Sequence, residues 1–175
     1  MMNRRNLLSG AFALLAGVAV APLARATEGC GGFRWNVDAE MALFQGPAIP
    51  LAAGREPSAV PLLEAGRLYE LALAPQGDVA LVSPPGKPMP VDGTHAGMVR
   101  LRVPATGRYR IAQDQHFWVD ALQGGKLLPA LDFQRSVGCT PQKIVIYELA
   151  AGTDLLVQLS GSPQAVVRLS LTPAT

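Results

Sequence analysis

The sequence predicts an all-β fold, an antiparallel β-sandwich of jelly-roll type with about eight strands. After residue 60, apolar and polar residues alternate with a period of two, as they do in strands with one buried face. Glycine and proline, 18 and 15 of the 175 residues, fall mainly between these runs and favour turns there. Short turns between successive strands are typical of antiparallel sheets, since a parallel sheet needs longer crossover connections.

The individual runs predict two kinds of strand. Three runs alternate and predict one wet face: 69–73, 99–103 and 109–111. Four later runs are apolar throughout and predict strands in the packed middle of the sandwich: 117–122, 144–149, 155–159 and 166–171. The proline-rich segment 83–90 predicts a surface loop. Residues 37–44 predict a helix opened by Asn36 or Asp38 as a cap, with an edge strand as the alternative.

The first 26 residues are typical of an export signal. Arg4 and Arg5 precede a moderately apolar stretch, and small residues place a signal-peptidase cut between Ala26 and Thr27. The paired arginines resemble the twin-arginine pattern, and the general secretory route is the alternative. We therefore expect a signal-peptide helix that is removed, a periplasmic or secreted protein, and no permanent membrane anchor.

Removal of this signal changes the charge of the chain. The whole sequence has 15 Lys and Arg against 13 Asp and Glu, and the signal takes three arginines and no acid with it. The net charge thus changes from +2 to −1, so the basic character of the full sequence gives no support to a nucleic-acid partner. Residues 27–175 are expected to form a single β-sandwich domain.

Two cysteines, Cys30 and Cys139, remain after the predicted cut. An even number of cysteines in an oxidising compartment favours a disulfide between them, with two buried thiols as the alternative.

Aromatic and cationic residues are the candidates for ligand binding. Phe117 and Trp118 are adjacent in a predicted strand, so one faces the core and the other is available to a ligand. Four arginines are expected on one wet face of two neighbouring strands, as an anion-binding patch or as partners of cross-strand carboxylates: Arg100, Arg102, Arg108 and Arg110.

A metal site is the alternative reading. His95, Asp114 and His116 could supply the two histidines and one carboxylate of a non-haem iron centre, with copper or zinc as other metals. Jelly-roll dioxygenases of the cupin-like, homogentisate type use such a set, but the close histidine spacing of cupins is absent here. A polar turn with a surface histidine is the simpler explanation of residues 114–116, because turns favour Asp and other polar residues.

Four segments resemble the strand layout of bacterial pre-peptidase C-terminal domains, which are exported β-sandwiches that usually accompany hydrolases: 107–112, 117–120, 155–161 and 166–171. The chain from Cys30 onward also resembles small stand-alone exported proteobacterial proteins without an established activity. The resemblance implies a sandwich, but no catalytic domain or acidic calcium cluster accompanies it. The leading hypothesis is a non-enzymatic exported module that binds a protein, a glycan or another envelope component, and the alternative is the metal-dependent enzyme.

Overall fold

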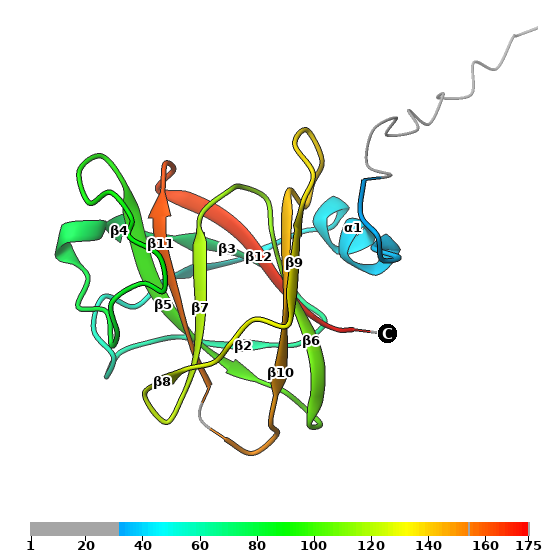
Figure 1. The fold of residues 1–175 in the computed structure, drawn as a ribbon. Coiled ribbons are helices and arrows are strands. Elements are labelled where there is room, and N and C mark those ends of the chain that lie inside the picture. Colours follow the sequence, from blue (N-terminus) through cyan, green and yellow to red (C-terminus); the bar gives the residue numbers. More distant parts are fainter. Residues whose placement is uncertain (1–31, 154, 175) are drawn as a thin grey trace, which may run out of the picture.

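A computed structural model of the chain describes residues 32–153 and 155–174, and most of their regular structure is strand (Figure 1). Within these residues, twelve strands form two six-stranded sheets, which confirms the predicted all-β sandwich. The predicted signal helix, the cut after Ala26 and Cys30 all lie outside the described residues.

The two sheets are here called sheet A and sheet B. Sheet A has the order β1 (Ile49–Ala52), β3 (Leu68–Ala72), β12 (Val166–Pro173), β6 (Gly107–Gln113), β10 (Lys143–Leu149) and β9 (Asp132–Arg135). Sheet B has the order β2 (Leu62–Glu64), β5 (His95–Arg102), β11 (Leu155–Ser162), β7 (Trp118–Gln123) and β8 (Lys126–Leu127), while β4 (Ala74–Pro75) pairs with β5. Each sheet has one parallel pair, β1 with β3 and β2 with β5, so the expectation of purely antiparallel sheets is wrong at these two edges.

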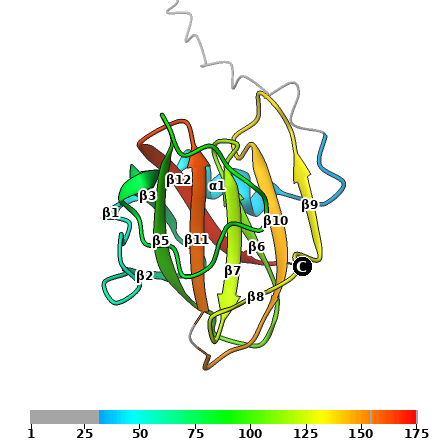
Figure 2. The same ribbon diagram turned by 60° about the vertical axis from the view of Figure 1, so that its left-hand side comes forward.

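The chain changes sheets at most of its turns. The connections β5 to β6, β6 to β7, β10 to β11 and β11 to β12 all cross from one sheet to the other (Figures 1 and 2). The prediction that short turns join neighbouring strands therefore fails for these four connections. Alternation tells which side of a strand is buried, but it does not tell which sheet the strand joins.

The core lies between the two sheets and follows the predicted alternation. Leu71 on β3, Ile111 on β6 and Leu159 on β11 have no exposed surface. Burying a side chain of this size contributes about 1.5 to 3 kcal/mol, so these inward positions account for much of the stability of the sandwich.

Helix α1 (Asp38–Gln45) covers the outer face of sheet A, which confirms the predicted helix (Figure 1). The side chain of Asn36 accepts the backbone N–H of Asp38 at 2.9 Å and satisfies one of the donors that a helix start leaves open. A second apolar cluster joins the helix to the sheet: Val37, Phe44, Leu68, Ala112 and Ile144.

Arg110 lies beneath this helix and not on a wet face. Its side chain is 5% exposed, and Nη1 lies 3.4 Å from Oε1 of Glu40, whose side chain is 1% exposed. Nη1 also donates to the carbonyl of Asn36 at 2.7 Å, and the Thr172 hydroxyl donates to Glu40. The expected exposure of Arg110 is wrong because α1 covers the outer side of β6.

Residues 79–94, here called the strap, contain the proline-rich loop and follow the 3-10 helix η1 (Gln76–Asp78). The strap passes across the outer face of sheet B (Figure 2). The Gln158 side chain accepts the N–H of Ser83 and donates to its carbonyl, both at 3.0 Å. The Asp120 carboxylate accepts the N–H of Gly86 at 3.0 Å. The predicted loop is therefore fastened to the sheet by hydrogen bonds from two strands.

Candidate functional site

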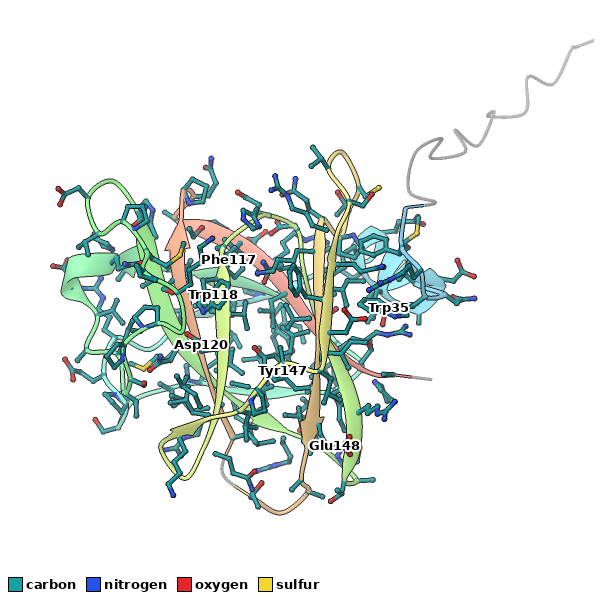
Figure 3. The ribbon with its side chains drawn as sticks, in the orientation of Figure 1. Trp35, Phe117, Trp118, Asp120, Tyr147 and Glu148 are labelled. Carbon is teal, nitrogen blue, oxygen red and sulfur yellow. The ribbon has the colours of Figure 1, made fainter. Side chains whose placement is uncertain are left out.

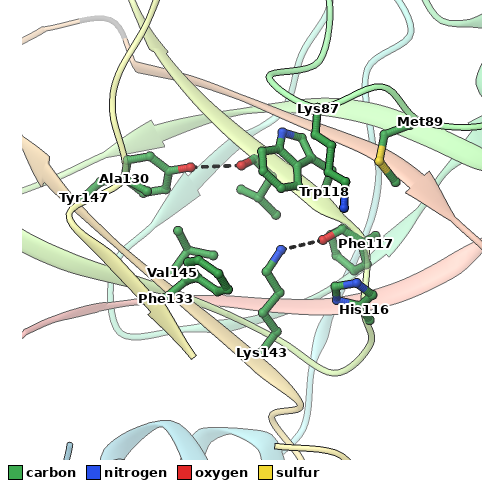
Figure 4. Close-up of a pocket in the computed structure, with 11 residues that line it drawn as sticks. Lys87, Met89, His116, Phe117, Trp118, Ala130, Phe133, Lys143, Val145 and Tyr147 are labelled. Atoms are coloured by element: carbon green, nitrogen blue, oxygen red, sulfur yellow. Dashed lines mark hydrogen bonds between the residues drawn. The ribbon is translucent and has the colours of Figure 1, made fainter. Parts of the chain in front are cut away.

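The free edge of β7 faces the inner side of β10 across the opening between the sheets. β8 pairs only with the last two residues of β7, so the first half of that edge has no strand beside it. Nζ of Lys143 donates to the Phe117 carbonyl at 2.8 Å, and the hydroxyl of Tyr147 donates to the Val119 carbonyl at 2.9 Å (Figure 4). Side chains of β10 thus take the place of the missing strand.

A cavity of about 220 Å³ opens beside these contacts, and we call it the lateral pocket. β10 contributes Lys143, Val145 and Tyr147 to its wall, and β7 contributes Trp118 from the opposite side (Figure 4). Phe133 on the edge strand β9 also lines the pocket, and its surface is 64% exposed. The walls are therefore largely aromatic and aliphatic, as in most small-molecule sites.

Basic side chains lie next to this apolar wall. Lys87 reaches the pocket from the strap, beside the apolar Met89, and His116 reaches it from the turn before β7. The pKa of His116 is lowered, first by burial and then by the charges of Arg135, Lys143 and Lys87. A histidine repelled by three cations indicates that positive charge gathers at this end of the molecule.

Lys143 is the most unusual group of the site, because it is a lysine that is only 5% exposed. Burial lowers its pKa from 10.5 to about 8, against the opposing attraction of Asp120. Its Nζ lies 5.3 Å from the ring centroid of Trp118. Strongly perturbed lysines inside a pocket are candidates for function.

Asp120 attracts this lysine, but its hydrogen bonds go to other groups. Its Oδ1 accepts the indole N–H of Trp118 at 2.8 Å, and its Oδ2 accepts the N–H of Gly86. Figure 3 shows Trp118 and Asp120 side by side on β7, with Tyr147 between β7 and β10. The carboxylate holds the indole and the strap in position, and it forms no ion pair with Lys143 within the part of the chain that the structure describes.

The aromatic pair divides as expected in its burial, while ligand binding by either residue stays a prediction. Phe117 is buried in the core between the sheets, whereas Trp118 is partly exposed and lines the pocket.

The predicted arginine patch is wrong, since β5 and β6 belong to different sheets. Arg100 and Arg102 lie on β5 in sheet B. Arg108 lies on β6 in sheet A, and its Nε is 3.6 Å from the Glu148 carboxylate on the neighbouring strand β10. This pair is the cross-strand contact that the sequence offered as the alternative to an anion-binding patch.

The three candidate metal ligands are not assembled into a site. His95 begins β5 with its Nδ1 buried, whereas His116 is exposed at the pocket. Asp114 accepts the backbone N–H of Arg168 at 3.0 Å, and burial raises its pKa. Among residues 32–153 and 155–174, no three His, Cys, Asp or Glu side chains form a group that could hold a metal ion.

Cys139 is buried, with its sulfur 3.1 Å from the Ser136 hydroxyl oxygen. Its predicted partner Cys30 lies outside the described residues, so the disulfide stays a prediction.

No family model, curated protein or solved structure matches this chain. The resemblance to pre-peptidase C-terminal domains stays a prediction. In the described part of the chain, no helix has both the length and the apolar character needed to cross a membrane.

Sequence reasoning missed Lys143 and Tyr147. A signal for both was present, because Lys143, Val145 and Tyr147 alternate along one strand and must share a face. Since Val145 is predicted to face the core, Lys143 must face the core as well.

Proposed function

We propose that this protein is an exported, non-enzymatic binding module and that it takes its ligand in the lateral pocket. The observation that carries the proposal is the makeup of the lateral pocket, because an aromatic and aliphatic wall with one buried lysine is the pattern of small-molecule sites. Its volume of about 220 Å³ exceeds the roughly 150 Å³ of an apolar cavity that is known to admit benzene. One aromatic ring or a short acyl chain fits such a space.

Among the expected ligand classes, the walls favour an envelope component with an apolar body. A glycan needs several polar partners, whereas Trp118, Phe133 and Val145 offer mainly carbon surface. Trp118 and Phe133 approach from different sheets, so a flat ligand between them contacts both halves of the sandwich.

Fluorescence of Trp118 tests the proposal. The chain has two tryptophans, and Trp35 lies beside α1, away from the pocket (Figure 3). The variant Trp35→Phe, expressed with its own signal and purified from periplasmic extract, leaves Trp118 as the single fluorophore. We expect saturable changes with phenol, benzamide, benzoate or octanoate and none with glucose. A flat response to every apolar and amphipathic probe, or failure to reach the periplasm, contradicts the proposal.

A further inference from the structure

The donor geometry of Lys143 leaves part of its hydrogen-bonding capacity open. A lysine ammonium has three N–H donors, and the Phe117 carbonyl accepts one of them. Neither a second acceptor nor an ion pair with Lys143 occurs among the described residues. Buried charges are normally paired, so an ammonium with a neutral partner indicates a place for an anion.

The charges around the pocket also select a negative ligand. Lys87 on the strap and Arg135 on β9 both act on Lys143 with the same sign of charge. Asp120 is the one described carboxylate that attracts it, and both of its oxygens already accept hydrogen bonds. The pocket therefore offers positive charge and donors but has no acidic lining residue.

The size and the wall of the pocket narrow the anion to a monocarboxylate. A doubly charged phosphate is normally held by several donors, such as a bidentate arginine or a row of backbone N–H groups. The pocket lining has one buried cation and includes no arginine. A cavity of roughly 150 Å³ holds benzene with its six carbons, so in proportion a pocket of about 220 Å³ admits about nine non-hydrogen atoms. Benzoate has that size.

We propose that the lateral pocket binds a small carboxylate with an aromatic or short aliphatic body, and that Lys143 is the counterion of its carboxylate. Trp118 and Phe133 hold the apolar body, while the carboxylate points inward to Nζ. This inference rests on the proposed binding function, which it narrows to one ligand class.

Binding of the carboxylate depends on the protonated form of Lys143. The ligand attracts the ammonium and therefore raises the pKa of Lys143, so affinity is highest below about pH 8 and falls as the free lysine loses its proton. The charged and titratable groups that act on Lys143 or share its pocket are Asp120 on β7, Arg135 on β9, Lys87 on the strap, His116 in the turn before β7 and Tyr147 on β10, whose pKa burial raises. Protonation of His116 at acid pH adds positive charge and strengthens binding.

The test compares benzoate with benzamide, which has the same shape and no charge. Titrations of the Trp35→Phe protein at pH 7 should show benzoate binding about tenfold more tightly than benzamide, the range of one charge-assisted hydrogen bond. Lys143→Met should remove this preference. Lys126→Met, the same change at an exposed lysine of β8 that does not line the pocket, should keep it.

Three results overturn the inference: equal affinity for benzoate and benzamide, an unchanged preference in Lys143→Met, or binding of neutral probes alone. In these cases the proposed binding function survives. If no probe binds at all, both the binding function and the carboxylate inference are refuted. If Lys143→Met does not fold, NMR titration of the Lys143 side chain in the unsubstituted protein decides. Saturating benzoate must raise the pKa of Lys143, and an unchanged pKa refutes its role as counterion.

Discussion

The buried ammonium of Lys143 makes the stability of the ligand-free protein rise between pH 8 and pH 10. In the unfolded chain this lysine has its ordinary pKa of 10.5, and in the fold the pKa is about 8. The difference means that burying the charged form costs about 3 kcal/mol at neutral pH. Above pH 8 the folded protein releases the proton that the unfolded chain still holds, so the free energy of unfolding increases with pH.

The expected increase from pH 8 to pH 10 is about 2 kcal/mol in the free energy of unfolding. The window ends near pH 10, because burial also raises the pKa of Tyr147 and the unfolded chain then ionises its tyrosine first, which favours unfolding. Urea unfolding followed by circular dichroism at pH 8, 9 and 10 measures the effect. Lys143→Met should lose the increase, and Lys126→Met should retain it. The reasoning is refuted if the free energies of unfolding of Lys143→Met and of the unsubstituted protein change with pH by the same amount, within about 0.5 kcal/mol.

Three further predictions concern other parts of the fold. Arg110→Met should lower the free energy of unfolding, measured by urea titration, by about 3 to 5 kcal/mol, because it leaves the buried carboxylate of Glu40 without its cation. The double variant Arg110→Met/Glu40→Leu should recover most of this loss. Gln158→Leu should speed amide hydrogen exchange in the strap while the exchange of β11 stays slow, because both side-chain hydrogen bonds to the strap are lost; equal exchange in both proteins would contradict the assigned anchor. Protein purified from periplasmic extract should gain alkylated mass at Cys30 and Cys139 only after reduction, and reduction should lower its stability by about 4 kcal/mol.

Local patterns in the sequence predict much of the fold. Alternation identifies β3, β5 and β6 because each has one face in the core, and the helix-forming residues after Asn36 identify α1. The parallel pairs of β1 and β2 are formed by strands of four and three residues with partners distant in the chain, and no local pattern encodes such a pairing.

The candidate site is less predictable, since it depends on which strands meet across the sandwich. Trp118 is recognisable as half of an aromatic pair with one outward member. The role of Lys143 arises only when the unpaired part of β7 lies opposite β10, and Arg110 is buried only because a helix from another part of the chain covers its strand. In both cases the decisive neighbour is remote in sequence.

The manner in which the strap is held has a consequence for how this pocket can diversify. Gln158, Asp120 and Gln76 grip backbone atoms of the strap, the last of them through the carbonyl of Pro90. The side chains that the strap points at the pocket, including that of Lys87, are not needed for these attachments. Pocket-facing side chains of the strap can therefore change by point substitution while the backbone of the strap stays in place. Substitutions at these positions can alter ligand selectivity, in evolution or by engineering, without a change in the fold.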